Sequence, residues 1–253
     1  MLTTRKLLES PASEIVLGFD LEWTKNYRIS NGNKPFCFSF VYFTPSVDLH
    51  LIEEDLELGF ISKYVEDKKE IPSLIEDANR VLGDFIQRYE LVVVGHQLPS
   101  DMGVLIKYDS TRQPRNLLLL RQTWRKRNQP GDDNSLTVFD TRYDLDTFLV
   151  GKSRRLVDVC IECKLDVTQP ELGSSSMTQM QNDFYRTQNK EIMEKLSVLN
   201  LRHSLSAALL YSCFVQGYKP ASSVNVNKII YKNLRGCFEY IQDEQFKRLI
   251  SAD

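Results

Sequence analysis

Two acidic side chains at the end of an apolar segment have the type and spacing to do chemistry. Asp20 and Glu22 belong to the segment Phe19–Trp23 (FDLEW), at the end of the mainly apolar run Glu14–Phe19 (EIVLGF). Side chains alternate along a strand, so both carboxylates point to one side, roughly 7 Å apart by Cα. Two such acids repel each other unless a cation lies between them, and oxygen ligands suit Mg²⁺ and Mn²⁺. The alternative is a solvated strand end with two unrelated acids.

A third acid follows the continuous apolar run Leu91–Gly95 (LVVVG), which is typical of a strand buried on both faces. A Gly-His turn comes next, and Asp101 falls in the first turn of the helix expected after it. Ligands gather at the carboxyl ends of strands in open α/β sheets, so Asp20, Glu22 and Asp101 can converge at one rim. Taken alone, Asp101 is more simply an acid that interacts with the dipole of its own helix.

Hydrophobic periodicity predicts the elements that must position these acids. An antiparallel meander of three strands is expected first, at Glu14–Phe19, Pro35–Phe43 and Leu49–Ile52. A helix and two strands are expected next, at Ile71–Arg88, Leu91–Gly95 and Leu136–Phe139. Five further helices are expected, at Arg142–Leu149, Leu156–Lys164, Met177–Leu199, Leu201–Gln216 and Asn225–Ile250. This order predicts an α/β fold with a mixed sheet flanked by helices, in a single domain over 1–253 whose residues 217–253 form a helical C-terminal extension.

Three motifs together resemble the DEDD group of 3′–5′ exonucleases, which have the ribonuclease H-like fold. The first is FDLEW at 19–23, the second is GHQLPSD at 95–101, and FDT at 139–141 is similar to the strand that follows the second motif. The first motif is similar to that of the Werner-type and ribonuclease D-type branch. The resemblance covers roughly residues 14–216, and it implies release of 5′-nucleotides from a 3′ end of DNA or RNA.

The resemblance also implies a site for two Mg²⁺ or Mn²⁺ ions. Asp20 would bind both ions, Glu22 the ion on the nucleophile side, and Asp101 the second ion. Such ions lie about 3.5–4 Å apart and stabilise the attacking and leaving oxygens of an in-line displacement. His203 would accept a proton from the attacking water, because a neutral imidazole titrates near neutral pH.

The third motif of the family is incomplete in this chain. One branch has H-x-x-x-x-D, and residues 200–208 (NLRHSLSAA) supply His203 but carry Ala208 at the acidic position. The other branch has Y-x-x-x-D, and its nearest match, Leu196–Asn200 (LSVLN), lacks both groups. We prefer the first alignment because His203 is a functional residue type, so Ala208 is taken as the catalytic position that lost its acid. The alternative for His203 is a helix histidine packed against its neighbours.

The missing fourth carboxylate leaves two classes of function open. The chain is an exonuclease impaired by a replaced acid, whether natural or introduced, or it is a catalytically inactive module that binds nucleic acid or serves as a scaffold. The sequence alone does not separate the two.

A basic run after the second motif indicates a polyanionic partner. Trp124 lies among six basic residues with no acid between them, namely Arg112, Arg115, Arg121, Arg125, Lys126 and Arg127. Guanidinium groups can grip phosphates and an aromatic ring can stack on a base. We therefore expect a single-stranded 3′ end to contact this run, together with Trp23, His96 and Gln97 beside the acids. A second basic patch follows at Gly151–Arg155, and the alternative for both is a solvated basic face.

Composition limits the class of protein. Hydrophobic residues make up 42% and charged residues 26% of the 253 residues, which allows a sizeable core and excludes wholesale disorder. The net charge of −2 excludes a histone-like or ribosomal-type basic protein. Residues 1–100 carry 10 basic and 16 acidic groups (−6) and the rest 22 and 18 (+4), an asymmetry that suggests an ionic partner.

Cysteine content and hydropathy predict the compartment. Five cysteines have no framework spacing, and the C-x-x-C pair Cys160 and Cys163 cannot complete a four-ligand zinc site. We expect these two on a helix, one of them buried. Residues 1–14 lack the apolar core of a signal peptide, and no run approaches the roughly 20 apolar residues of a membrane helix. The expectation is a soluble intracellular protein, cytoplasmic or nuclear, with no membrane partner.

Overall fold

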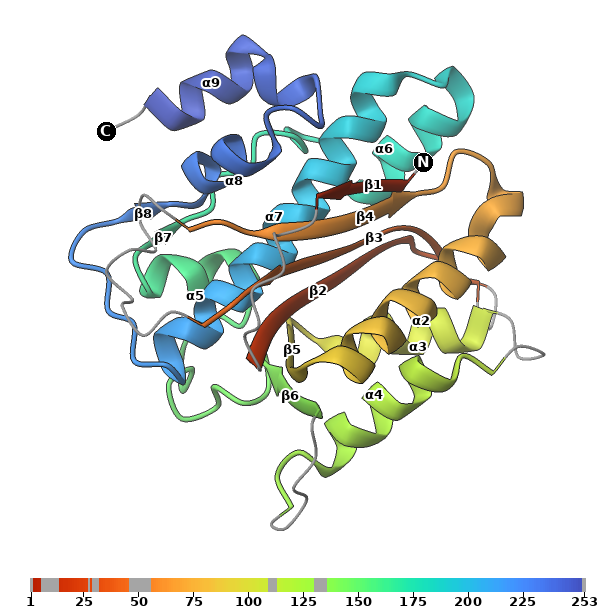
Figure 1. Ribbon diagram of the computed structural model, residues 1–253. Helices are drawn as coiled ribbons and strands as arrows, with labels where there is room; N and C mark the ends of the chain where they lie inside the picture. The colour runs from red at the N-terminus through yellow and green to blue at the C-terminus, as the bar shows by residue number, and fades with distance from the viewer. Residues whose placement is uncertain are drawn as a thin grey trace.

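The computed structural model of the chain describes residues 2–5, 14–26, 28, 32–45, 56–108, 113–129 and 136–251. These residues form a six-stranded mixed sheet between helical layers (Figure 1), so the predicted mixed α/β class is confirmed. The strands are β1 (Leu2–Arg5), β2 (Glu14–Thr24), β3 (Lys34–Phe43), β4 (Gly59–Tyr64), β5 (Glu90–Gly95) and β6 (Leu136–Asp140). A separate parallel pair joins β7 (Leu165–Asp166) to β8 (Val224–Asn225).

The strand order brings three carboxyl ends to one edge of the sheet. The order is β1-β4-β3-β2-β5-β6, with β2 antiparallel to β3 and parallel to β5, and with β5 parallel to β6. Gly18 of β2 pairs with Val94 of β5, and Gly95 pairs with Asp140 of β6. The residues after these pairs therefore leave the sheet on the same side, where ligands bind in open α/β sheets.

Alternating side chains of β2 contribute to two hydrophobic clusters. Val16 belongs to one of them, whereas Leu17 and Phe19 belong to the other. The helices that supply the Leu17 cluster are α2 (Ile71–Arg88), α3 (Leu98–Tyr108), α4 (Arg115–Lys126), α6 (Met177–Thr187) and the first turns of α7 (Lys190–Phe214). The rest of α7 supplies the Val16 cluster together with α5 (Leu156–Glu162), α8 (Val226–Leu234) and α9 (Glu244–Ser251).

Helix α7 approaches β2 most closely at a glycine. A Cβ at Gly18 would overlap the carbonyl oxygen of Ser204 and lie 3.2 Å from the Cβ of Ala208. The hydroxyl of Ser204 also lies 2.6 Å from that of Ser39 on β3, so the helix is held against two strands. Glycine at position 18 thus lets the backbone of α7 sit directly on the sheet, two residues before Asp20.

Several predicted elements form as expected. The helix Ile71–Arg88 is α2, and the strands at Glu14–Phe19, Pro35–Phe43, Leu91–Gly95 and Leu136–Phe139 lie within β2, β3, β5 and β6. The strand predicted at Leu49–Ile52 lies outside the described residues. The third strand of the meander among those described is β4, which was not predicted, and neither were β1 and α4.

Three helix predictions are wrong. Residues 142–149 form turns, because the Asp140 and Asp144 side chains accept hydrogen bonds from backbone N–H groups at residues 142 and 140. The predicted break after Leu199 lies instead at Gln188, which ends α6 in a left-handed conformation (φ 54°), while the Asn189 side chain caps α7. The helix predicted over 225–250 is divided into α8, a 3₁₀ turn at 240–242 and α9.

The C-terminal elements pack into the same cluster as the sheet. Val226 of α8 and Phe246 of α9 are buried in the cluster that contains Val16 of β2. Arg202 of α7 forms two hydrogen bonds, of 2.6 and 2.8 Å, to Glu171, and both side chains are fully buried. Among the described helices, none has the length and apolar character required to cross a membrane.

The contact at Gly18 makes a prediction about stability. Gly18→Ala should lower the free energy of unfolding by about 1–3 kcal/mol, because the added methyl group must displace the backbone of α7. Gly103→Ala is the control, because a Cβ there meets open space, and alanine should stabilise α3 by about 1 kcal/mol. Urea denaturation of both variants measures this, and equal stability of Gly18→Ala and the unsubstituted chain would contradict it.

Candidate functional site

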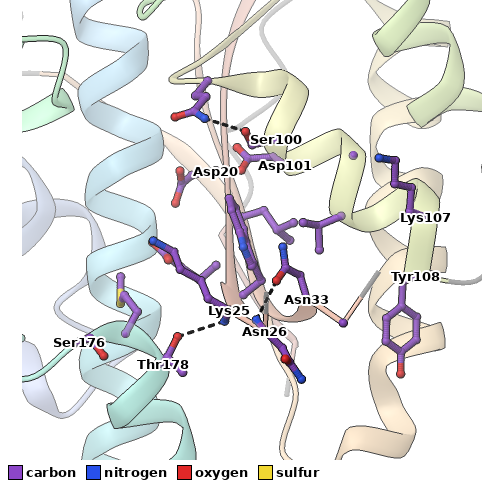
Figure 2. Close-up of a pocket in the computed structure, with 18 of the residues that line it drawn as sticks. Asp20, Lys25, Asn26, Asn33, Ser100, Asp101, Lys107, Tyr108, Ser176 and Thr178 are labelled. Atoms are coloured by element: carbon purple, nitrogen blue, oxygen red, sulfur yellow. Dashed lines mark hydrogen bonds between the residues drawn. The ribbon is translucent and has the colours of Figure 1, made fainter. Parts of the chain in front are cut away.

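The three acids singled out from the sequence line one pocket at the carboxyl edge of the sheet. Asp20 and Glu22 come from the end of β2, and Asp101 comes from the first turn of α3. The pocket has a volume of about 1060 Å³, and its opposite wall is formed by residues 172 and 175–178. Figure 2 shows the side chains of Asp20 and Asp101 near each other, one extending from the strand and the other from the helix.

His203 of α7 reaches the two acids of β2. Its Nδ1 atom lies 3.1 Å from Glu22 Oε1 and 3.5 Å from Asp20 Oδ2. One ligand atom from each of the three side chains lies within 4.8 Å of the others, a spacing that could hold a metal ion. Asp101 is outside this tighter group, so the structure brings it into the same pocket but not into the same cluster.

Asn200 is a site residue that the preferred alignment missed. It is fully buried one helical turn before His203, and its Nδ2 donates a 2.6 Å hydrogen bond to Asp20 Oδ2. The thiol of Cys37 on β3 donates to the other end of the amide, with 3.5 Å between Sγ and Oδ1. The signal that could have found Asn200 was the second alignment, in which it stands at the acidic position of Y-x-x-x-D.

Ala208 does not lie beside the acids. It is fully buried in the hydrophobic cluster behind β2, and its Cβ faces Gly18. The residue of α7 that contacts Asp20 is Asn200, about two turns earlier. Position 208 therefore does not face the acids, because α7 approaches Asp20 with its earlier residues.

Burial and mutual repulsion raise the pKa values of two of the acids. Burial, followed by the charge of Asp20, raises the pKa of Glu22 to about 7. Burial and the charges of Asp20 and Glu22 raise the pKa of Asp101 well above its usual range. Asp101 is only 3% exposed, and its Oδ2 has no hydrogen-bond partner in the described part of the chain. Each of these shifts would be relieved by a cation in the pocket.

His203 supplies that positive charge in this structure. Burial alone would lower the pKa of His203, but its hydrogen bonds to Asp20 and Glu22 outweigh burial and raise the pKa to about 10. The imidazole is therefore protonated at neutral pH and pairs with both acids. A proton-accepting role, as the resemblance implies, requires another cation to take over the two carboxylates first.

Gln169 orients the far side of the imidazole, and no pattern in the sequence pointed to it. Its Oε1 lies 3.0 Å from His203 Nε2, which must donate because a carbonyl oxygen only accepts. The segment around Gln169 is fixed by its neighbours. Glu171 binds Arg202, and the carbonyl of Thr168 accepts from Asn227 of α8 at 3.1 Å.

The turn between β5 and α3 is held by Asp140 at the end of β6. Its carboxylate accepts 3.0 Å hydrogen bonds from the backbone N–H groups of Gln97 and Leu98. Gln97 has a left-handed backbone (φ 71°), and these bonds keep it in that conformation. His96 and Gln97, which were expected beside the acids, both line the pocket. Through these two bonds, Asp140 also fixes the start of the helix that carries Asp101.

The basic run on α4 does not reach the pocket. Trp124 donates its indole N–H to Asp140 Oδ2 at 3.0 Å, and Arg127 lies over the Trp124 ring and pairs with Asp144 at 2.7 Å. Arg125 and Lys126 are exposed near the end of the helix, whereas Arg121 is half-buried. None of the five predicted contact residues on α4 is among those that line the pocket, and Arg112 lies outside the described residues.

Two lysines that the sequence did not single out line the pocket. Lys25, just after β2, and Lys107, in the last turn of α3, are exposed and line the pocket together with Trp23 (Figure 2). Neither ammonium group pairs with an acid anywhere in the ranges that the structure describes. Isolated lysines carry no motif, so only their placement in the fold distinguishes them.

The C-x-x-C pair has the environment expected of structural cysteines. Cys160 is buried on α5 and Cys163 is half-buried at its end, and all five cysteines are free. In the described part of the chain, neither belongs to a group of three side chains spaced to hold a metal ion.

Comparison with known proteins finds no matching family model, curated protein or solved structure. Three carboxylates face a polar pocket, one of them with a buried oxygen that has no partner in the described chain. Oxygen-rich sites of this kind suit Mg²⁺, Mn²⁺ or Ca²⁺ better than softer metals.

His96 makes a prediction about pH. Burial lowers the pKa of His96 to about 4, and its ring is bonded to Thr141 Oγ1 and to the carbonyl of Arg154, each at 2.9 Å. The unfolded chain binds a proton at this residue below about pH 6.5 and the folded chain does not, so stability should fall as pH drops from 6.5 to 4.

His96→Gln should remove this dependence. The slope of unfolding free energy against pH should decrease by up to about 1.4 kcal/mol per pH unit between pH 6 and 4.5. Urea denaturation at several pH values measures the slope. Identical slopes for the two proteins would show that His96 is not held neutral by the fold.

Proposed function

We propose that this chain is a metal-dependent 3′–5′ exonuclease of the DEDD group whose activity is limited by Asn200. The observation that carries the proposal is the convergence of Asp20, Glu22 and Asp101 on one pocket, with His203 beside them. The motifs that resemble the family supply these four side chains. The mixed sheet between two helical layers agrees with the ribonuclease H-like fold that the motifs imply.

The side chains divide the work of phosphodiester hydrolysis among them. Asp20, Glu22 and Asp101 form the acidic wall, and a divalent ion held there would stabilise charge on the phosphate and lower the pKa of bound water. His203 presents Nδ1 to the acids and would move a proton at that atom, while Gln169 holds its Nε2. Asp140 keeps Asp101 in place through the backbone of the preceding turn.

The outer part of the pocket supports nucleic acid as the substrate. Lys107 lies six residues beyond Asp101 on α3, about 9 Å along the helix axis, and Lys25 lies on the opposite wall. Ammonium groups at this distance from the acids can bind phosphates upstream of the scissile one. Trp23, which lines the same pocket, offers an aromatic surface on which a base can stack.

The hydrogen bonds and ion pairs that Asp20 and Glu22 already make favour a second candidate function, binding of nucleic acid without hydrolysis. Asn200 donates to Asp20, and protonated His203 pairs with both acids, so these carboxylates are satisfied without a metal ion. A chain stable in this state could bind a 3′ end without cutting it. This rival is a non-catalytic nucleic-acid-binding module.

Position 200 separates the two functions. Asn200→Asp should restore an acid beside Asp20 and raise nucleotide release from single-stranded DNA or RNA in Mn²⁺ by about 100-fold or more, about 2.7 kcal/mol of barrier. Ala208→Asp is the matched control, because it buries a carboxylate against Gly18. It should give no rise in activity and should destabilise the fold.

Nucleotide release is measured by separation of labelled oligonucleotides, and folding of each variant by thermal unfolding. If Asn200→Asp folds and binds oligonucleotide but releases nothing in Mg²⁺ or Mn²⁺, the exonuclease proposal fails and the binding module remains. A rise in activity with Ala208→Asp instead would contradict the placement of the missing acid at position 200.

The two pocket lysines make a prediction about binding. Replacing Lys25 and Lys107 by Gln should weaken binding of a single-stranded oligonucleotide and reduce the slope of log K against log salt by about 1.4, or about 0.7 per lost phosphate contact. The control is the double replacement of Arg125 and Lys126 by Gln on α4, which should leave the slope unchanged. Fluorescence anisotropy at several salt concentrations gives both slopes, and the opposite pattern would assign the substrate to α4.

A further inference from the structure

The oxygens of the acidic wall are not equally open to a cation. Asp20 Oδ2 accepts from Asn200 Nδ2 at 2.6 Å and has His203 Nδ1 at 3.5 Å. Glu22 Oε1 has the same Nδ1 at 3.1 Å. N–H donors from α7 therefore cover the side of these two carboxylates that faces the helix.

Cys37 keeps the amide of Asn200 in its donor orientation. Both side chains are fully buried, and the thiol lies 3.5 Å from Asn200 Oδ1. Turning the amide over would place its oxygen against a carboxylate oxygen of Asp20 and its NH₂ group against the thiol. The contact between the two oxygens would be repulsive, because both can only accept, so Asn200 faces Asp20 as a donor and not as a metal ligand.

The side that faces α3 is different. Asp101 is only 3% exposed, lines the pocket opposite Asp20, and its Oδ2 has no hydrogen-bond partner in the described residues (Figure 2). A buried carboxylate oxygen without a partner costs free energy unless a cation or a donor satisfies it. No N–H donor of α7 is bonded to it, in contrast to the oxygens of Asp20 and Glu22.

We infer that the chain binds one divalent cation, between Asp20 and Asp101, and that Asn200 and His203 close the second metal position beside Glu22. The inference rests on the proposed function for the class of metal, and it deepens that function by giving the number of ions and their place. Glu22 then remains paired with His203 while the ion is bound. Where the family has a carboxylate that binds metal, Asn200 presents an N–H donor to Asp20. The second metal position is therefore blocked by a hydrogen-bond donor, in addition to having one negative charge fewer.

The experiment is titration of the whole chain with Mn²⁺ alone, by calorimetry and electron paramagnetic resonance. The unsubstituted chain should bind one Mn²⁺ and show the spectrum of an isolated ion. Asp101→Asn should weaken binding by at least about 10-fold, whereas Glu22→Gln, which removes a neighbouring charge but no ligand, should keep one ion and weaken binding by less than Asp101→Asn does. Asn200→Asp should bind two ions and show the spin coupling of a close pair.

Thermal unfolding in the absence of metal serves as the folding check for each variant, and Glu22→Gln is the matched acid-to-amide control for Asp101→Asn. Two ions in the unsubstituted chain, no ion at all, or equal loss in both variants would each overturn the inference. The result is independent of hydrolysis. One ion with the expected variant pattern, but no nucleotide release by any variant, would support this inference and remove the exonuclease proposal.

Discussion

Repulsion among three carboxylates of one pocket is the constraint that the rest of the site must offset. Asp20, Glu22 and Asp101 line this pocket with little access to water, the charge of Asp20 raises the pKa of Glu22, and the charges of both raise the pKa of Asp101. The fold offsets this repulsion unevenly. On the side of α7, a protonated His203 and the amide of Asn200 face the acids, whereas Oδ2 of Asp101 on α3 has no hydrogen-bond partner among the described residues. The asymmetry follows directly from which helix carries donors.

The donors of α7 are positioned by contacts far from them in sequence. Gly18 lets the helix backbone rest on β2, and the buried pair of Arg202 and Glu171 ties the helix to the segment that carries Gln169. A buried ion pair adds little net stability, because desolvation offsets the attraction, but it tolerates only one geometry. Since Asn227 of α8 bonds to Arg202 at 2.8 Å, the C-terminal elements take part in placing His203.

The features of the site that follow from neighbouring residues in the chain could be predicted, whereas those that depend on contacts between residues far apart in sequence could not. Strand alternation and the shared carboxyl edge of parallel strands are local rules, and they place Asp20 and Asp101 at one pocket from the sequence. The choice between Asn200 and Ala208 was beyond such rules, because periodicity along a helix gives spacing but not which turn meets the strand. That turn is set by the contact at Gly18, 186 residues before Ser204 in the chain.

The intramolecular contacts of the basic run on α4 were not predictable for the same reason. As a sequence it contains no acid, but folding brings Asp140 and Asp144 to Trp124 and Arg127, so that part of the run stabilises the fold. The ammonium groups at the pocket belong instead to Lys25 and Lys107, which no local pattern marks. Asn200 shows how a single side-chain type decides the balance of charge at such a site. Its amide donates a hydrogen bond to Asp20, whereas a carboxylate at the same place would add a further negative charge to the pocket.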